Sequence, residues 1–413
     1  MRALRSRLCI LLIVLFAFGL AAAAAEPAAP AKKPIAALLA SWFPNSHPEV
    51  LIGRVLRTYS LDGKGEPSQL QIASIYLDRP QKNDMTEKLA AEFNIKVCKT
   101  MEEALTLGTG KLAVGGVFLC TEWADYPKDP RGATLYPHRQ MFDEVVKVFK
   151  ASGQVVPVFV DKHLAHNWED SWYIYNTAKQ MKIPLMAGST MPVSWRIPAT
   201  DVKRDAKLKE LVVTSYHTLD AYGFHGLEIL QCLAERRQGG ETGIVSVQAL
   251  KGDAVWEAAG KAYDPELLAD ALQRNVPPLT IEDVKQKEKS PVLFIIQYKD
   301  GTRALMFGLN YSILHWSAAW RYADGKKDST IFWLHEAYPF ATFTAQMKGL
   351  EAMYLTGTPT WPAERTLLSS GILDAGLTSL GENGRLVKTP YMAKIKYQAT
   401  FNWSQPTDPL AGK

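Results

Sequence analysis

Short apolar runs alternate with amphipathic stretches through the first half of the chain, and the two patterns predict different elements. Strands are predicted at 35–40, 70–77, 95–97, 114–120, 157–160 and 184–187, and helices at 48–57, 85–93, 101–107, 137–152 and 168–181. Strands that alternate with helices are typical of βαβ units. We therefore predict an α/β domain over residues 35–190, built on a doubly wound parallel sheet of the Rossmann type.

Beyond residue 190 the extended segments become longer and pair locally. Strands are predicted at 210–215, 244–250, 292–298 and 304–310, helices at 222–236, 340–355 and 364–379, and a polar surface loop at 273–290. Lys299-Asp300-Gly301-Thr302 is a hairpin signal between two of these strands. The pattern predicts a C-terminal α+β domain over 191–390 with a mainly antiparallel open sheet, followed by a tail at 391–413.

The first 25 residues have the pattern of a secretory signal peptide. Arg2, Arg5 and Arg7 precede an apolar run at 8–20, and a string of alanines follows. We expect cleavage near Ala25, a linker at 26–34, and export to the periplasm or the medium by a Sec-type route, with no stable membrane span afterwards. An uncleaved membrane anchor is the alternative.

Composition and charge exclude several classes of partner. The chain has 413 residues, 47% hydrophobic and 22% charged, which fits a two-domain globular protein. Without the three N-terminal arginines, 44 Lys+Arg face 42 Asp+Glu, so the balance falls from +5 to +2. Such a balance gives no footprint for nucleic acid or an anionic membrane. Cys98, Cys120 and Cys232 form no disulfide framework and no zinc spacing, so we interpret them as buried thiols.

Several short motifs stand in a characteristic order. Asp161-Lys162-His163 ends the 157–160 strand, Gly223-Phe224-His225 opens a helix that also carries Glu228, and Leu355-Thr356-Gly357 separates the last two helices. With these motifs, residues 35–390 resemble the Gfo/Idh/MocA family of glucose-fructose oxidoreductase, inositol dehydrogenase and rhizopine-catabolism proteins. Asp-Lys-His stands where that family has Glu-Lys-Pro, and Gly-Phe-His is similar to part of its second signature.

The resemblance implies a Rossmann domain for NAD or NADP, a sugar, polyol or glycoside as substrate, and an open C-terminal sheet that often forms homodimers. It also implies that Lys162 polarises the substrate oxygen and that His225 moves the proton. His138 is similar to a histidine at that point in the family. We assign it to the candidate cofactor site together with Asp78, which ends a strand and can accept a ribose hydroxyl, and with Arg79 beside a 2′-phosphate. A polar strand end is the alternative interpretation of Asp78.

The loop after the first strand departs from the family. A pyrophosphate needs glycines there, because only a backbone without side chains lets it approach the helix N-terminus. Residues 40–47 contain no glycine and include Trp42, Phe43 and Pro44. We therefore expect NAD(P) to bind weakly or not at all, and export without free nucleotide favours the same expectation.

The candidate catalytic residues are Lys162, His225, Tyr222 and Glu228. Histidine titrates near working pH, and burial shifts lysine, so both suit proton transfer. Tyr222 and Glu228 flank His225 on the predicted helix and are expected to share its face. The alternatives are a structural His225 and a Lys162 that forms an ion pair with Asp161 or Glu169.

A metal site was also considered for the start of the 168–181 helix. His166 and Asp170 have the spacing of two metal ligands, but acids and histidines there more often cap the helix, so no metal is predicted. Three functional hypotheses follow: a sugar-active oxidoreductase, a cofactor-free lyase or hydrolase on the same fold, and a carbohydrate-binding protein without catalysis.

Overall fold

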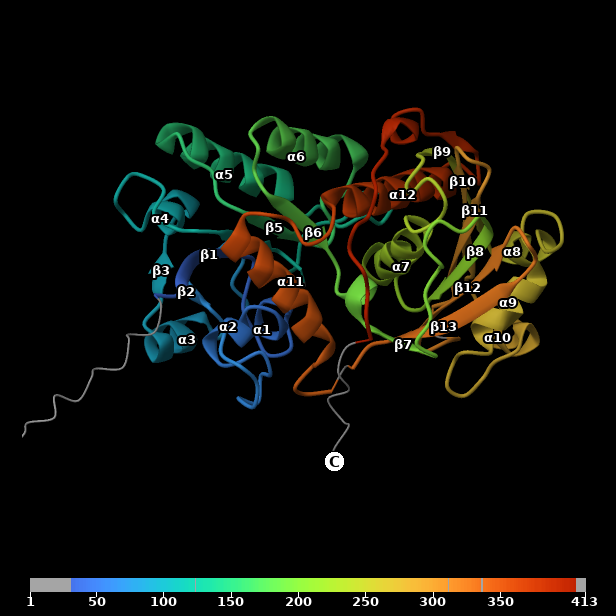
Figure 1. Cartoon of the computed structure of the whole chain (residues 1–413), viewed down its shortest axis with the longest axis horizontal. Coiled ribbons are helices and arrows are strands. Elements are labelled where there is room, and N and C mark those ends of the chain that lie inside the picture. The colour runs from blue at the N-terminus through green and yellow to red at the C-terminus, as the bar shows by residue number, and fades with distance from the viewer. Residues whose placement is uncertain (1–30, 123, 311, 336, 406–413) are drawn as a thin grey trace, which may run out of the picture. The chain divides into compact units, whose positions relative to one another are not determined.

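A computed structural model describes residues 31–405 apart from 123, 311 and 336, and these residues form two sheets (Figure 1). The predicted signal peptide and most of the predicted linker lie outside the described residues. The search for membrane-spanning segments covered the described part of the chain, and it found there no helix with the length and apolarity to cross a bilayer.

The first sheet is a six-stranded parallel sheet in the order β3-β2-β1-β4-β5-β6. Its strands are β1 Lys33–Leu39, β2 Leu70–Leu77, β3 Lys96–Cys98, β4 Val117–Cys120, β5 Val158–Asp161 and β6 Leu185–Gly188. The central strands β4 and β5 are buried along their whole length, as expected for parallel strands with helices on both faces. The predicted doubly wound sheet is confirmed, and its strand order reverses between β1 and β4.

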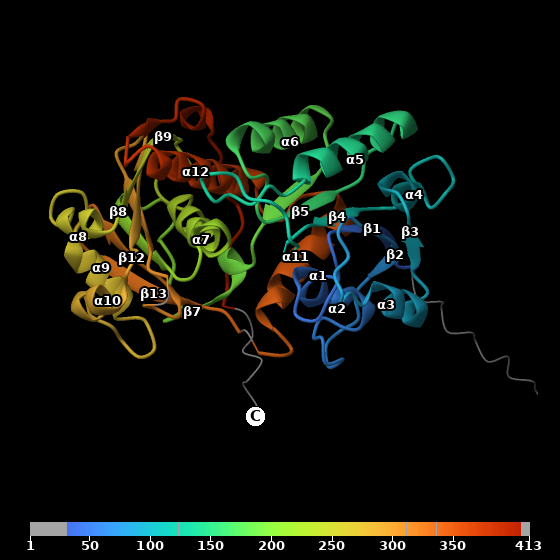
Figure 2. The same ribbon diagram turned by 180° about the vertical axis from the view of Figure 1, so that it is seen from behind.

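Helices cover both faces of this sheet (Figures 1 and 2). They are α1 His47–Val50, α2 Gly53–Leu56, α3 Thr86–Phe93, α4 Met101–Thr106, α5 His138–Ser152 and α6 Trp168–Gln180. The single helix predicted at 48–57 is wrong, because it is broken into α1 and α2. Val50, Leu51 and Ile52 are all buried in the core around Trp42. Consecutive residues of a straight helix point about 100° apart, so a straight helix cannot bury all three on one face.

The second sheet has eight strands in the order β14-β9-β10-β11-β8-β12-β13-β7. They are β7 Trp195–Ile197, β8 Leu208–Ser215, β9 Ile244–Lys251, β10 Val292–Tyr298, β11 Arg303–Gly308, β12 Trp316–Tyr322, β13 Lys327–Trp333 and β14 Val387–Lys388. Every neighbouring pair is antiparallel except β8 and β11. The prediction of a mainly antiparallel sheet is confirmed, although β7, β12, β13 and β14 were not predicted.

Helices lie on both faces of the second sheet as well. α7 Phe224–Ala234, preceded by a π-type turn at Leu219–Gly223, packs on one face. α8 Asp253–Glu257, α9 Pro265–Leu272 and α10 Ile281–Lys287 cover the other, where Leu268 and Leu272 join the cluster of Leu293 and Phe307. The loop predicted at 273–290 is therefore wrong in part, since Thr280 and Asp283 cap α10 reciprocally. The sheet face that the resemblance implies to be open is covered.

The last two helices connect the two sheets. α11 Thr342–Thr356 places Leu350 and Tyr354 in the core of the first sheet. α12 Ala363–Gly381 lies against α6, α7 and β9, and glycines allow its close approach. A side chain at Gly376 would overlap the ring of Phe294. These helices come last in the sequence, yet they contribute to the cores of both halves.

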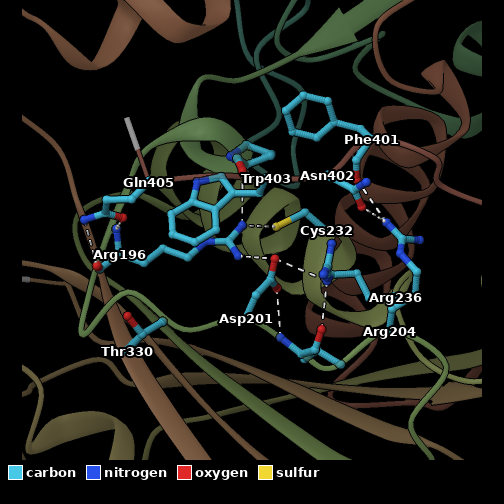
Figure 3. Close-up of polar contacts among 12 residues, drawn as sticks. Arg196, Asp201, Arg204, Cys232, Arg236, Thr330, Phe401, Asn402, Trp403 and Gln405 are labelled. Carbon is cyan, nitrogen blue, oxygen red and sulfur yellow. Dashed lines mark hydrogen bonds and ion pairs between the residues drawn. The ribbon is translucent and has the colours of Figure 1, made fainter. Parts of the chain in front are cut away.

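The described chain ends beside β7, which is an edge strand of the second sheet (Figure 3). The guanidinium of Arg196 lies over the ring of Trp403 at 4.1 Å and forms an ion pair with Asp201 at 2.6 Å. The side-chain amide of Gln405 accepts a hydrogen bond from the Arg196 N–H at 3.0 Å and donates one to the Arg196 carbonyl at 3.1 Å. One glutamine side chain therefore pairs with β7 as a neighbouring strand would.

We expect Gly376→Ala to lower the free energy of unfolding by about 2 kcal/mol, because its methyl group meets the Phe294 ring in a packed interior. Gly381→Ala in the same helix is the matched control. Its nearest neighbour would lie 4.0 Å away, so higher helix propensity should raise stability by up to about 1 kcal/mol. Urea denaturation of both variants measures the difference. Equal effects would contradict the packing that we describe for α12.

Candidate functional site

Three neighbouring strands of the first sheet deliver polar residues to one place. β1, β4 and β5 are parallel and adjacent, so their carboxyl ends meet at the edge where the strand order reverses. The loop after β1 supplies His47, the end of β4 supplies Cys120 and Glu122, and β5 supplies Asp161 and Lys162. The peptide bond between Lys162 and His163 is cis.

Lys162 forms a buried ion pair with Glu122. The two charged atoms are 2.5 Å apart, and each side chain is only 1% exposed. The alternative partners named from the sequence, Asp161 and Glu169, are both wrong. Glu169 is exposed in the first turn of α6. Asp161 binds His47 instead, because successive side chains of a strand point to opposite sides.

Asp161 is held by two donors on the same oxygen. His47 Nδ1 lies 2.7 Å from Asp161 Oδ2, and the Cys120 thiol donates to that oxygen at 3.5 Å. Burial alone would raise the pKa of Asp161, but the charge and hydrogen bond of His47 outweigh it, so the pKa is lowered. Burial, followed by the charge of Asp161, raises the pKa of Cys120 well above its ordinary value. The cluster therefore contains a carboxylate and a protonated thiol at neutral pH.

The atoms of His47, Cys120 and Asp161 that can bind a metal lie within 4.8 Å of one another. Histidine, thiolate and carboxylate are ligands that Zn²⁺ uses. Neither this group nor the role of His47 was predicted from the sequence. His166 and Asp170, which have the spacing of two metal ligands, make other contacts: Asp170 binds Arg139 at 2.8 Å, and His166 accepts a hydrogen bond from Asn167.

His225 is the second residue of α7, which follows the π-type turn after β8. It lies near the charged groups described above. Its pKa is lowered well below the ordinary value of 6.5, first by burial and then by the charges of Lys162, His47 and His163. These groups come from elements far apart in the sequence, yet they lie within electrostatic range of one imidazole. At neutral pH His225 is uncharged and has the capacity to accept a proton.

Tyr222 belongs to an aromatic wall beside His225. Its ring stacks on Trp316 at 5.6 Å and on His217 at 4.5 Å, and it meets the His225 ring edge-on at 6.1 Å. Trp316 in turn contacts His225 at 5.4 Å and donates to Ser215. The rings of this wall therefore form an apolar surface beside the imidazole of His225.

Glu228 is directed elsewhere. Its carboxylate accepts a hydrogen bond from the Ser189 N–H at 3.3 Å and lies against Gly188 at the end of β6. Burial raises its pKa to about 7, while Arg365, Ser369 and the Ser189 N–H oppose the shift. The structure therefore brings Tyr222 and Lys162 to His225 but does not bring Glu228 there. Tyr222 lies in the π-type turn before α7, whereas His225 and Glu228 lie on α7, so the three residues do not belong to one continuous α-helix.

His138 uses both ring nitrogens within the protein. Nε2 lies 2.6 Å from Thr121 Oγ1, and Nδ1 lies 3.3 Å from the Leu164 carbonyl. Burial lowers its pKa to about 4, so the ring is neutral and joins the loop after β4 to the segment after β5. Asp220 fastens the same loop, since its carboxylate accepts from Thr134 at 2.6 Å.

Asp78 and Arg79 directly follow β2 and contact the loop that contains Asp125 and Tyr126. The Tyr126 hydroxyl donates to Asp78 at 2.7 Å, and the Arg79 guanidinium lies 4.7 Å from the Tyr126 ring. Arg79 also donates to the Asp125 carbonyl. Both candidate cofactor residues are thus engaged by one loop of the same chain.

The carboxylate of Asp84 accepts hydrogen bonds from two donors in the loop after β1. Its Oδ2 accepts from Ser41 Oγ and from the Trp42 N–H, both at 2.7 Å. In a dinucleotide-binding site the N–H groups of this loop face the pyrophosphate. The Trp42 side chain is fully buried, and its indole donates to Glu49 at 2.7 Å. The Trp42 N–H of this loop is therefore bound to a carboxylate of the same chain, and the Trp42 side chain fills the interior beside it.

Solved structures share the fold of this chain. GenD2 from gentamicin A biosynthesis, in complex with NAD, superposes with a TM-score of 0.56 at 14% identity over 86% of this chain and 96% of its own. Scyllo-inositol dehydrogenase from Lactobacillus casei gives 0.54 at 12% identity over 86% and 98%. Myo-inositol dehydrogenase from Corynebacterium glutamicum gives 0.52 at 13% identity over 86% and 98%. No family model and no curated protein sequence matches the chain.

These neighbours define the class of fold. They are Gfo/Idh/MocA-like inositol dehydrogenases and oxidoreductases, and the chain combines the same Rossmann-like sheet with a mixed, mostly antiparallel second sheet. At this level of identity the likeness establishes the fold alone.

Glu122 and His47 are the site residues that the sequence analysis missed. Glu122 directly follows a predicted strand, as Lys162 does, and the carboxyl ends of adjacent parallel strands meet. That signal was available. His47 carried none, because it lies in a loop whose path depends on the burial of Trp42.

Glu228→Gln should reveal the raised pKa as a pH-dependent stability. In the folded state Glu228 keeps its proton up to about pH 7, whereas its ordinary value is 4.5. The stability that its protonation contributes is fully present below pH 4.5 and is lost as pH rises through 7, a change of up to about 3 kcal/mol. Relative to the wild type, the variant should therefore gain stability between pH 5 and pH 8 in thermal unfolding. Parallel profiles would contradict the assignment, and Glu169→Gln on the surface is the control.

Proposed function

We propose that this protein is an enzyme that acts on a sugar, polyol or glycoside by proton transfer at Lys162 and His225, without NAD(P) held as in its structural neighbours. The observation that carries the proposal is the buried Lys162–Glu122 pair, whose lysine acts electrostatically on a neutral, buried histidine. Perturbed groups of this kind gather at active sites. The substrate class comes from the neighbours, which are named as inositol dehydrogenases or as an enzyme of aminoglycoside biosynthesis.

In this proposal the two residues divide the chemistry between them. The Lys162 ammonium donates a hydrogen bond to a substrate carbonyl or hydroxyl oxygen and stabilises negative charge that develops there. Neutral His225 accepts the proton from the adjoining carbon or hydroxyl. Both His225 and His47 are 8% exposed, whereas Lys162 is 1% exposed. The histidines therefore have more exposed surface than the lysine.

The aromatic wall suits such a substrate. Tyr222 and Trp316 present ring faces beside His225, and sugar rings have apolar faces that pack on aromatic side chains. The resemblance to dehydrogenases favours NAD or NADP as cofactor, but the Asp84 and Glu49 carboxylates oppose a pyrophosphate in the loop after β1. A redox reaction is thus the second candidate, and nucleotide binding separates the two.

Calorimetric titration of the protein with NAD(H) and NADP(H) should show no binding in the micromolar range. The reason is that Asp84 already accepts the hydrogen bonds of the loop after β1, and the buried Trp42 side chain fills the space beside it. Activity on a panel of polyols, glycosides and 3-keto-glycosides should not need added nucleotide. Micromolar affinity for either nucleotide would replace the proposal with a dehydrogenase. Turnover of no compound in the panel would favour a carbohydrate-binding protein.

Lys162→Met should abolish turnover and lower the free energy of unfolding by about 3 to 5 kcal/mol, since it leaves Glu122 buried without its partner. The double variant Lys162→Met/Glu122→Gln removes both charges. It should recover most of the stability and remain inactive. Activity in this stable double variant would show that Lys162 does not take part in the reaction.

A further inference from the structure

Three neighbouring segments of the first sheet place a histidine, a cysteine and an aspartate together, and the proposed reaction uses none of them. Leu119 on β4 is paired with Val160 on β5. The next residues, Cys120 and Asp161, therefore lie side by side at the ends of two parallel strands. His47 opens α1 after the loop that follows β1, and β1 is paired with β4 on its other side. Two of the three side chains are thus positioned by strand register rather than by a loop.

The separations of the three ligand atoms are close to those of a tetrahedral metal site. All of them lie within 4.8 Å of one another. Cys120 Sγ is 3.5 Å from Asp161 Oδ2. Zinc bonds of about 2.3 Å to sulfur and about 2.0 Å to oxygen, at a tetrahedral angle, place such a pair about 3.5 Å apart. His47 Nδ1 is 2.7 Å from the same oxygen, and a movement of about 0.6 Å gives this pair the matching tetrahedral separation.

Protein surrounds this group, and one of its oxygens has no partner. Cys120 and Asp161 are each 1% exposed, and His47 is 8% exposed. Within the part of the chain that the structure describes, Asp161 Oδ1 is buried and forms no hydrogen bond. A carboxylate oxygen left unpaired in the interior loses its hydration without compensation. A cation bound to this carboxylate would supply that compensation.

The charges of the group match a divalent cation. A carboxylate and a thiolate together carry two negative charges, and an imidazole binds metal in its neutral form. With one divalent ion the buried set has no net charge, which limits the cost of removing it from water. The ammonium of the neighbouring Lys162 is compensated separately, because Glu122 lies 2.5 Å from it.

We propose that His47, Cys120 and Asp161 form a binding site for one divalent transition-metal ion, and that their ligand types select Zn²⁺. Imidazole nitrogen, thiolate sulfur and carboxylate oxygen all bind Zn²⁺, whereas Mg²⁺ and Ca²⁺ select oxygen ligands. Three protein ligands leave a fourth position for a water molecule. On binding, the thiol proton of Cys120 passes to solvent. The ion would fasten the loop after β1 to the ends of β4 and β5, whether or not the protein catalyses the proposed reaction.

Binding of Co²⁺ tests this site, because Co²⁺ occupies zinc sites and its bonds to thiolate absorb in the near ultraviolet. The protein, treated with a chelator and dialysed, should bind one Co²⁺ per chain with a sulfur-to-cobalt charge-transfer band, and Zn²⁺ should displace it. Cys120→Ser should abolish the band. His47→Gln should weaken binding by about 100-fold or more, since loss of a residue that only supports a ligand already costs about 10- to 100-fold. Serine and glutamine still offer a hydrogen bond to Asp161, so circular dichroism should show both variants folded.

Cys98→Ser is the matched control, because Cys98 is another buried thiol and lies outside the group. Cys98→Ser and His166→Gln should leave the band and the affinity unchanged. A wild-type protein without the charge-transfer band would overturn the site, and so would a band that persists in Cys120→Ser. Equal loss of Co²⁺ in Cys98→Ser and Cys120→Ser would place the metal elsewhere and would also overturn it. None of these readouts requires turnover of a sugar, so they test the metal site separately from the proposed function.

Discussion

The ion pair between Lys162 and Glu122 is the interaction on which the candidate site depends. Two charges removed from water are costly unless each compensates the other at close range. Here the partners come from the ends of β4 and β5, which the parallel sheet keeps side by side. The pair therefore ties the position of the lysine to the register of the sheet rather than to a loop. A charged group fixed so firmly also sets the electrostatics of the histidines around it.

Around this pair the protein has the fold of its structural neighbours, and in the loop after β1 its own side chains bind the backbone. The carboxylate of Asp84 accepts hydrogen bonds from Ser41 and Trp42, much as an anionic ligand would. The indole of Trp42 replaces the open space that glycines provide elsewhere. Ser41 and Trp42 are buried and Asp84 is partly buried, and hydrogen bonds join the three, so the loop is a packed structure. His47 reaches Asp161 only because this loop takes that path.

The parallel sheet could be predicted from the sequence, since β4 is an unbroken apolar run and α5 is amphipathic with a clear helical period. Lys162 and His225 were named from their places at a predicted strand end and helix start, and the structure has a strand end and a helix start there. The partner of Lys162 was missed although Glu122 follows a predicted strand, because the pairing also depends on the strand order, which local pattern does not contain. β12 and β13 were also not predicted, and Trp316 and Trp320 are buried on β12. The broken helix near Val50 shows tertiary burial overriding helical preference.

The binding of Gln405 to Arg196 has a consequence for how copies of the protein behave in a crowded solution. Exposed outer strands offer a row of free amide and carbonyl groups to any passing extended peptide, and proteins usually guard them. Here the Gln405 side chain forms hydrogen bonds with the backbone of Arg196 on β7, and the stacking of Trp403 on the Arg196 guanidinium holds this segment in place. Removal of residues 405–413 would therefore free the amide and carbonyl groups of Arg196 on β7, and this edge would be open to pairing with an extended segment of another molecule.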